Sequence, residues 1–340
     1  MGKIALEEHF NLPEFSDEVP QYVSPEIMKD INRRLLDLGA ERLAEMDAAG
    51  IDFSLLSLTS PGIQGKIDPK RAVADAARTN DTLAEVVATN PTRFGGFAAL
   101  PLQDPAAAAA ELERCVTQLG FHGALVNGYT NIKDADTGWY YDHERFWTFW
   151  ERAEALRVPV YLHPRDPLAG NQGIYEGHPE LFGAVWTFTV ETATHALRLM
   201  TSGLFDRFPK LTVILGHLGE TLPFNMWRIA HRAAAMGDLI KFDKPLTHYL
   251  LNNFYVTTSG NFHTQTLNAT MAEMGADRVL YSSDYPYESM REASDWFDNA
   301  ALNDNDRAKI GHLNARRLFP NIPEGIGHGE SAPELGRRSR

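Results

Sequence analysis

Eight short stretches of apolar and β-branched residues recur along the chain, and they predict the strands of a sheet. These stretches are residues 3–7, 53–58, 94–100, 123–127, 158–164, 211–217, 254–260 and 279–284. Most of them are apolar at every position and do not alternate with polar residues, which is typical of parallel strands that are covered on both faces. We therefore expect a parallel sheet in the interior of an α/β protein.

Segments with helical character separate these strands. The alanine-rich run that ends at Gly120 begins with Asp104, a suitable N-cap residue, and with Pro105 in the first turn. Further helices are predicted at residues 40–49, 143–156, 192–205 and 264–274. Eight strand-then-helix units in succession favour a closed (β/α)₈ TIM barrel over an open doubly wound sheet.

The 340 residues fit one large domain of this kind. We predict that the barrel occupies residues 1–320 and that residues 321–340, which are polar with glycine and proline, form a C-terminal arm or a disordered tail. Three longer segments follow predicted strands, namely residues 11–39, 129–142 and 165–185. Because barrel enzymes build their active sites at the C-terminal face of the strands, these inserted loops are expected to surround a site.

The charge balance and the composition exclude several classes of protein. The chain has 32 lysines and arginines against 45 aspartates and glutamates, a formal net charge of −13. This balance argues against nucleic-acid binding, which requires clustered positive charge. No apolar run is long enough to span a membrane, and the first residues lack the apolar stretch of a signal peptide. With a single cysteine, Cys115, the chain cannot form an internal disulfide, so we expect a cytoplasmic protein.

Polar residues stand at the ends of several predicted strands, which are otherwise apolar. Glu7 and His9 end the first strand, His163 the fifth and Asp284 the eighth. Glu7 and His9 are two residues apart and therefore point to the same side of their strand. A lone histidine at a strand end is usually a hydrogen-bonded structural residue, but the repetition on separate strands favours a shared site. Two carboxylates and two imidazoles suit a divalent cation such as Zn²⁺ or Mn²⁺.

A second pair follows the sixth strand, where His217 and Glu220 are three residues apart. A carboxylate beside an imidazole fixes its tautomer and raises its basicity, which supports proton transfer. The alternative is that Glu220 stabilises only the start of the next helix. On that helix Arg228 is a candidate either for binding an anionic substrate or for a surface salt bridge.

An ordered set of motifs resembles one family over about residues 3 to 319. The motifs are IALEEHF, FAALPLQDP, LGFHGALVNG, VYLHPR, HALRLMTSGLFDRFPKL, VILGHLGE, MWRIAHR, TTSGNF, SSDYPYE and KIGHLNARRLF. They are similar to those of gamma-resorcylate (2,6-dihydroxybenzoate) decarboxylase and of the related 2,3-dihydroxybenzoate and salicylate decarboxylases. These enzymes belong to the amidohydrolase superfamily, so the resemblance implies a TIM barrel of the amidohydrolase type.

The resemblance also implies roles for individual residues. One divalent ion, Zn²⁺ or Mn²⁺ with Mg²⁺ as a third candidate, is implied to bind four residues: Glu7, His9, His163 and Asp284. Asp284 is also the implied catalytic acid, assisted by a dyad of His217 and Glu220. Asn127 and Arg228 match positions that line the pocket for a small aromatic acid. The family further implies a homodimer or a homotetramer.

The implied reaction is a reversible, non-oxidative decarboxylation of an ortho-hydroxybenzoate to a phenol and carbon dioxide. The EEHF motif favours 2,6-dihydroxybenzoate as the substrate, whereas SPGIQ, DYPYE and LNDNDRAKIG are closer to the 2,3-dihydroxybenzoate branch, so both substrates stay open. One alternative is a metal-dependent amidohydrolase or lactonase, although hydrolytic members typically begin with His-x-His and Glu7 replaces the first histidine here. The other alternative is a non-catalytic barrel that binds an aromatic acid.

Overall fold

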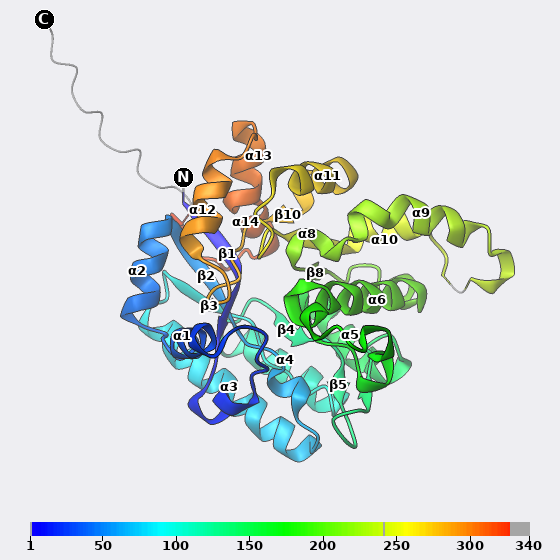
Figure 1. The fold of residues 1–340 in the computed structure, drawn as a ribbon, viewed down its shortest axis with the longest axis horizontal. Coiled ribbons are helices and arrows are strands. Elements are labelled where there is room, and N and C mark those ends of the chain that lie inside the picture. The colour runs from blue at the N-terminus through cyan, green and yellow to red at the C-terminus, as the bar shows by residue number, and fades with distance from the viewer. Residues whose placement is uncertain (1, 241, 327–340) are drawn as a thin grey trace, which may run out of the picture.

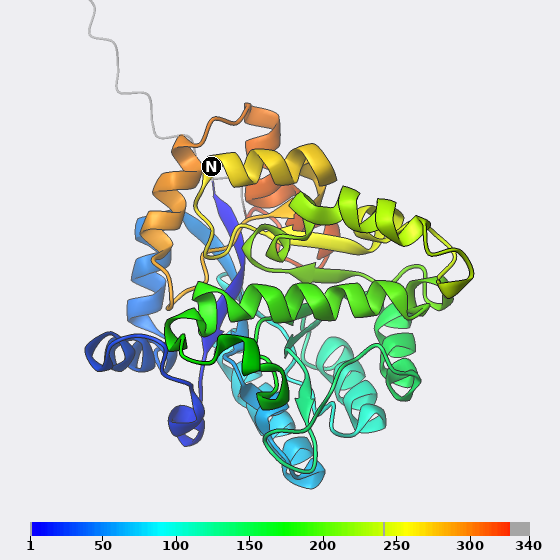
Figure 2. The ribbon, with the colours of Figure 1, turned by 45° about the vertical axis from the view of Figure 1, so that its right-hand side comes forward.

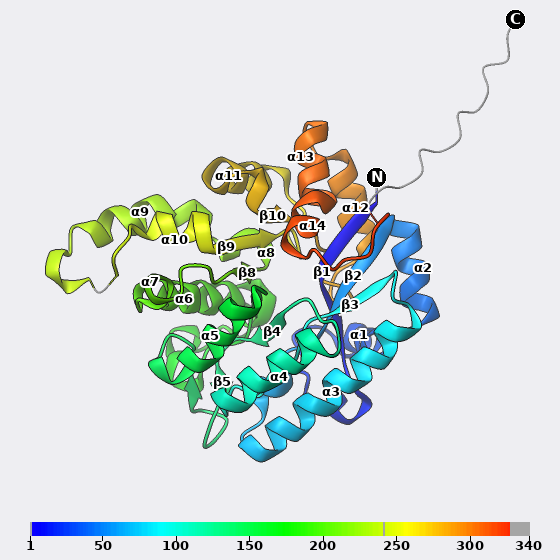
Figure 3. The same ribbon diagram turned by 180° about the vertical axis from the view of Figure 1, so that it is seen from behind.

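Eight parallel strands form a barrel that helices surround in the computed structural model, which describes residues 2–240 and 242–326 (Figures 1 and 3). The barrel strands are Lys3–Phe10 (β1), Ile51–Leu58 (β2), Phe94–Gly96 (β3), Ala124–Asn127 (β4), Val160–His163 (β7), Val213–Leu215 (β8), Phe254–Thr257 (β9) and Val279–Leu280 (β10). A separate hairpin follows β4, formed by Thr130–Asn131 (β5) and Gly138–Trp139 (β6). Each barrel strand lies within or overlaps one predicted stretch, so the predicted α/β barrel is confirmed.

The barrel consists of two continuous ladders of strands, which meet at two junctions. One ladder runs in the order β1-β2-β3 and the other in the order β10-β9-β8-β7-β4. Between β3 and β4 the strands are joined by a single bridge, in which Ala98 pairs with Ala124. This junction is reinforced by the Ala98 amide, which donates to the carbonyl of Gly123 at 2.8 Å.

The second junction, which we call the seam, joins β10 to β1 at the level of the predicted metal ligands. It is formed by a bridge between Glu8 and Tyr285 and by the Asp284 amide, which donates to the carbonyl of Glu7 at 3.0 Å. A side chain completes it, because the Ser282 hydroxyl oxygen accepts the Glu7 amide at 2.6 Å. The His9 amide also donates to the Tyr285 carbonyl at 2.7 Å. The seam nevertheless has a single bridge, whereas β1 pairs with β2 at six positions.

Helices follow the strands and form the outer layer (Figure 2). They are Pro25–Leu35 (α1), Ala40–Ala49 (α2), Pro69–Thr89 (α3), Pro105–Thr117 (α4), Trp147–Leu156 (α5), Thr187–Thr201 (α6), Leu204–Arg207 (α7), His217–Glu220 (α8), Leu222–Ala234 (α9), Leu246–Asn253 (α10), Thr264–Met274 (α11), Met290–Asn299 (α12), Asp304–Ala308 (α13) and Asn314–Leu318 (α14). The predicted bounds of α2 and α11 are confirmed, and Asp104 caps α4 as predicted. Helix α6 begins five residues before its predicted start. The sequence did not predict this first turn, because its β-branched residues have low helix propensity.

The N-terminal end of the barrel is closed by the end of the described chain. Ile322 and Ile326 are buried in one cluster with Phe319 and with inward-facing residues of the strands. Arg316 holds this segment in place, since its Nε donates to the Ile326 carbonyl at 2.8 Å. The packed body thus continues to residue 326, whereas the sequence predicted that the domain ends at residue 320. The rest of the predicted arm, residues 327–340, lies outside the described residues.

The predicted inserted loops interlock at the opposite end. Asp166 accepts hydrogen bonds from the hydroxyls of Tyr22 and Thr187, which joins the loop after β1, the loop after β7 and the start of α6. The ring of Tyr22 also packs edge-on against Phe188, with 5.3 Å between centroids. Within residues 2–240 and 242–326, no helix has both the length and the apolar character needed to cross a membrane.

Candidate active site

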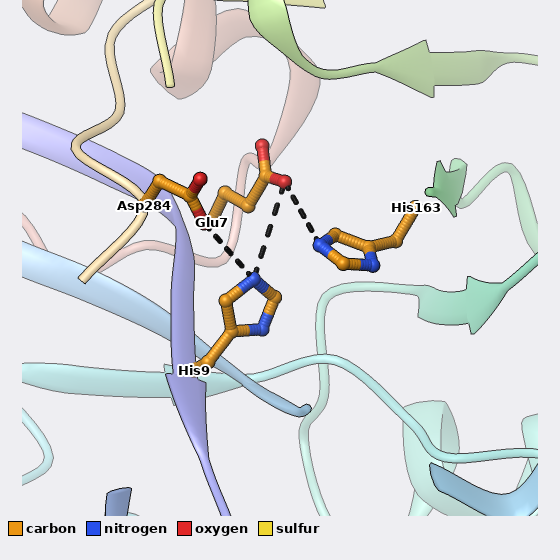
Figure 4. A group of neighbouring side chains, drawn as sticks. All are labelled: Glu7, His9, His163 and Asp284. Atoms are coloured by element: carbon orange, nitrogen blue, oxygen red, sulfur yellow. Dashed lines mark ion pairs between the residues drawn. The ribbon is translucent and has the colours of Figure 1, made fainter. Parts of the chain in front are cut away.

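Four side chains converge above the C-terminal end of the barrel (Figure 4). Glu7 and His9 project from β1, His163 ends β7, and Asp284 follows β10; one ligand atom from each lies within 4.8 Å of the others. His9 Nε2 is 3.3 Å from an Asp284 carboxylate oxygen, and His163 Nε2 is 3.3 Å from Glu7 Oε1. The sequence predicted this convergence, which arises because each side chain points toward the barrel axis from the end of its strand.

The donor atoms of this cluster suit a divalent cation. Glu7 Oε1 and His9 Nε2 are buried and have no hydrogen-bond partner, which is costly unless a further ligand satisfies them. The other ring nitrogen of His9 lies 3.2 Å from the Ser57 hydroxyl, a contact that orients the ring with Nε2 toward the cluster. Two carboxylates and two imidazoles form a donor set that binds Zn²⁺ or Mn²⁺.

The ionisation tendencies of the cluster agree with this interpretation. Burial lowers the pKa of His163 well below its usual value, so its imidazole is neutral, as a metal ligand must be. Burial alone raises the pKa of Asp284, but the interactions with the nearby His217 and His9 rings outweigh it, and the net pKa is lowered. Asp284 is therefore a carboxylate before any ligand binds.

His217 and Glu220 are presented by an unusual turn between β8 and α9. His217, Leu218, Gly219, Glu220 and Thr221 all have positive φ angles, between 53° and 88°, so the backbone makes one left-handed turn. Four of these residues carry a Cβ, and such a conformation costs each of them roughly 1–2 kcal/mol. Strain of this kind persists where the surrounding structure holds a functional geometry in place.

The turn brings the two predicted dyad residues into contact. His217 Nδ1 lies 2.6 Å from a Glu220 carboxylate oxygen, and the other oxygen accepts a hydrogen bond from Thr189 at 2.7 Å. His217 Nε2 then points at Asp284, 3.4 Å away. Burial alone lowers the pKa of His217, but the charges of Glu220 and Glu7 outweigh it and raise the pKa well above its usual value. The dyad therefore stores a proton on His217, next to Asp284.

A cavity of about 740 Å³ opens above this group. Its lining residues include His217, Glu220 and Asp284 as well as the aromatic residues Trp186 and Phe188. Gly260 leaves room at the bottom, since a Cβ there would lie 3.0 Å from the His217 ring and 3.2 Å from the Asp284 carboxylate. The volume is typical of a small-molecule site, and the partly aromatic wall suits a planar ring.

Comparison with known proteins identifies the family. A model of the amidohydrolase family matches residues 9–320. The chain belongs to the amidohydrolase family. It is similar to gamma-resorcylate decarboxylase from Polaromonas sp. (strain JS666), with 51% identity over 320 residues that cover 94% of this chain and 98% of the relative.

Two solved structures of decarboxylases extend this similarity to three dimensions. A 2,6-dihydroxybenzoate decarboxylase in complex with 2,6-dihydroxybenzoate is 51% identical, with a TM-score of 0.92 over 94% of this chain and 99% of that chain. A dihydroxybenzoic acid decarboxylase from Polaromonas sp. JS666, with bound manganese and the inhibitor 2-nitroresorcinol, is 50% identical, with a TM-score of 0.91 over 94% and 97%.

Two predicted substrate-binding residues of this amidohydrolase do not line the cavity. Arg228 is exposed on α9, because Leu222 and Met226 define the buried side of that helix and Arg228 lies about 200° around the axis from Met226. Asn127 is buried at the end of β4 beside His163, where its amide nitrogen donates to the Leu58 carbonyl at 3.3 Å. Its Oδ1 has no hydrogen-bond partner, so it retains the capacity to accept one.

The structure of this amidohydrolase adds a carboxylic acid that the sequence analysis did not identify. Glu288 lines the cavity, and partial burial together with the charge of Asp284 raises its pKa to about 7. It follows Asp284 by four residues, and its amide donates to the Asp284 carbonyl at 3.1 Å. No sequence motif marks Glu288. Its position four residues after Asp284, a predicted metal ligand at a strand end, is nevertheless a signal that could have pointed to it.

Proposed function

We propose that this chain is a metal-dependent carboxy-lyase that converts 2,6-dihydroxybenzoate to 1,3-dihydroxybenzene and carbon dioxide without an oxidant. The observation that carries the proposal is the dyad of His217 and Glu220, which meets a four-residue metal site beneath a cavity with aromatic walls. The similar proteins support the same substrate, since they are decarboxylases of gamma-resorcylate, another name for 2,6-dihydroxybenzoate.

One divalent ion, Mn²⁺ or Zn²⁺, is held by Glu7, His9, His163 and Asp284 in this proposal. Such an ion supplies positive charge for the carboxylate and for the ionised ortho-hydroxyl of the substrate. The cavity requires this charge, because none of its described lining residues is a lysine or an arginine, while Glu220, Asp284 and Glu288 are acidic. His217 provides the one further positive charge when it is protonated.

The order of bond changes follows from the chemistry of the ring. Direct loss of carbon dioxide would leave an aryl carbanion in the ring plane, without resonance stabilisation. Protonation of the carboxylated carbon first avoids this intermediate, and the ortho-hydroxyl groups donate the electron density that makes this carbon basic. The bond from the ring to the carboxylate then breaks, its electron pair returns to the ring, and aromaticity is restored.

Asp284 is the proposed proton donor to the ring carbon. Because its pKa is lowered, it must first receive a proton, either from His217, 3.4 Å away, or from the phenolic group of the substrate. Glu220 keeps the imidazole oriented through its contact with Nδ1, so that Nε2 faces Asp284. The proposed roles are thus proton delivery for Asp284, proton storage for His217 and orientation for Glu220.

A panel of hydroxybenzoates tests this function. We expect the purified protein with Mn²⁺ to release carbon dioxide from 2,6-dihydroxybenzoate, and 2,3-dihydroxybenzoate to be the second candidate substrate. Both 3- and 4-hydroxybenzoate should remain unconverted, because they lack an ortho-hydroxyl. High bicarbonate with 1,3-dihydroxybenzene should give some carboxylated product. Hydrolysis of lactones or amides without turnover of any hydroxybenzoate would instead establish the hydrolase alternative.

The acidity of Glu288 predicts a pH-dependent affinity. Since its pKa is about 7, the side chain is neutral below that pH and negatively charged above it, where it repels an anionic substrate. The KM of the wild type should rise between pH 6 and pH 8, and Glu288→Gln should lower the KM at pH 8 by roughly fivefold, or about 1 kcal/mol. Glu85→Gln, the same charge change at an exposed position on α3 outside the cavity walls, is the control. A KM that rises equally in both variants would contradict this role for Glu288.

Two further features remain part of the proposal. A homodimer or homotetramer and a cytoplasmic location are expected from the family and from the composition, respectively. Exposed aromatic side chains on α9, Phe224 and Trp227, support an assembly in which subunits cover this helix. Sedimentation of the purified protein will determine the number of subunits.

A further inference from the structure

Glu7 is enclosed below the cavity by three hydroxyl groups that belong to other strands. Tyr161 on β7 and Ser259 after β9 both donate hydrogen bonds to Glu7 Oε2, and the Thr257 hydroxyl lies 3.4 Å from the same oxygen. Thr257 also lies 2.8 Å from the hydroxyl of Tyr161 and 2.8 Å from that of Ser259. All four side chains are buried.

We propose that Tyr161, Thr257 and Ser259 form a hydroxyl cradle that makes Glu7 a one-oxygen metal ligand. The cradle residues are positioning residues, because they act on the metal through Glu7. The inference rests on the metal-dependent function proposed above and adds to it the way in which one ligand is oriented.

The distribution of protons within the cradle determines which carboxylate oxygen remains available. Each hydroxyl has one proton to donate, and Tyr161 and Ser259 direct theirs to Glu7 Oε2. The Thr257 hydroxyl completes the chain between them. Glu7 Oε1 has no hydrogen-bond partner and lies 3.3 Å from His163 Nε2, on the side of the predicted ligands. The carboxylate therefore has one hydrogen-bonded oxygen and one free oxygen.

The alternation of side chains along the strands explains why the cradle lies directly beneath the ligands. Tyr161 precedes His163 by two residues on β7, so the two side chains point to the same side of the strand. Thr257 precedes Ser259 by two residues in the same way. Inward-facing residues of a barrel form successive layers, and the cradle is the layer below the metal site.

Two further contacts show that this space is built around the Glu7 carboxylate. Gly216 leaves room for it, since a Cβ at that position would lie 2.9 Å from Glu7 Oε2 and 3.2 Å from the Ser259 hydroxyl. The Ser259 oxygen also accepts the main-chain amide of His217 at 3.2 Å. Ser259 therefore connects the metal ligand to the first residue of the left-handed turn that carries the dyad.

Removal of single hydroxyls tests the cradle. We expect Tyr161→Phe and Ser259→Ala each to weaken Mn²⁺ binding by roughly 10- to 100-fold, as loss of a hydrogen bond to a metal ligand generally does. Ser259→Thr retains the hydroxyl and should bind within about threefold of the wild type. The measurement is the dissociation constant of Mn²⁺ in competition with a fluorescent indicator. The electron paramagnetic resonance spectrum of the loaded protein should also change in Tyr161→Phe and Ser259→Ala.

The matched controls are variants of a second buried pair of hydroxyl residues, which lies outside the site. Tyr281 is fully buried, and its hydroxyl lies 2.7 Å from that of Ser294, so Tyr281→Phe and Ser294→Ala remove the same groups away from Glu7. Both controls should leave the Mn²⁺ affinity within about twofold of the wild type. A purely structural role for the cradle would lower the melting temperature of the metal-free variants and leave their Mn²⁺ affinity unchanged.

The outcomes separate this inference from the proposed function. Wild-type Mn²⁺ affinity in Tyr161→Phe and Ser259→Ala would overturn the cradle, while decarboxylation by the same proteins would leave the function intact. A wild-type protein that binds no divalent metal would overturn both. Should Tyr161→Phe fail to fold, the comparison of Ser259→Ala with Ser259→Thr decides the matter, since those two variants differ in the hydroxyl that reaches Glu7.

Discussion

Replacement of Asp284 by asparagine is expected to lower kcat for decarboxylation by a factor of at least roughly 10² to 10⁴, the usual contribution of a general acid. The amide cannot deliver a proton to the ring, although its oxygen can still contact a metal ion. Substrate binding should remain measurable. His217→Asn should have a smaller effect, because its proposed role is to supply Asp284 and not the ring carbon.

An isotope experiment identifies the proton transfer itself. Wild-type turnover in heavy water should place one deuterium on the carbon that lost the carboxylate, and mass spectrometry of the product measures it. Asp295→Asn, the same substitution on the exposed face of α12, should retain full activity. A metal-loaded Asp284→Asn protein with near-normal turnover would show that the proton comes from elsewhere, and His217 would then be the leading candidate.

Loss of metal is the second large effect that we expect. His163→Ala removes a neutral imidazole ligand, and Glu7→Gln replaces a charged oxygen by an amide. Each change should lower the metal content and the decarboxylase activity together, with a loss of affinity above roughly 100-fold, because direct ligands contribute more than the groups that orient them. Elemental analysis of the purified variants measures the metal, and chelation of the wild type should abolish activity in the same way.

The control for these variants is a buried histidine at the other end of the barrel. His122 lies before β4, and neither of its ring nitrogens has a hydrogen-bond partner. His122→Gln should therefore keep the full metal content, even if the protein unfolds at a lower temperature. Unchanged metal stoichiometry in both His163→Ala and Glu7→Gln would refute the predicted ligand set.

The sequence was most informative where a local pattern determines the structure. The apolar runs identified all eight strands, and the polar residues at their ends identified the four side chains that the structure brings together. Side-chain alternation was sufficient for Glu7 and His9, because both lie on one strand with period two. The contact between His217 and Glu220 could also be predicted, because the two residues are only three positions apart. The left-handed turn that joins them was not expected from the sequence.

Features that depend on tertiary register could not be predicted in this way. Tyr161 and Ser259 reach Glu7 across 154 and 252 residues of chain, and no local pattern relates such positions. Arg228 lies outside the cavity because the buried side of α9 is set by its packing, and a shift of two residues turns a side chain to the opposite side of a helix. Ile322 and Ile326 were hidden in a polar segment, since two apolar residues are too few to mark a buried element.

The seam between β10 and β1 has a consequence for the thermal stability of the protein. Glu7 and His9 stand on one side of the seam and Asp284 on the other, so the proposed cation would form a cross-link across a junction with a single bridge. By mass action, a cation that binds only the folded chain adds about 2.7 kcal/mol to the free energy of unfolding at 100 times its dissociation constant. Treatment with a chelator should therefore accelerate amide hydrogen exchange along β1 and β10 before it does so in the helices. Storage in Mn²⁺ would preserve the barrel as well as its activity.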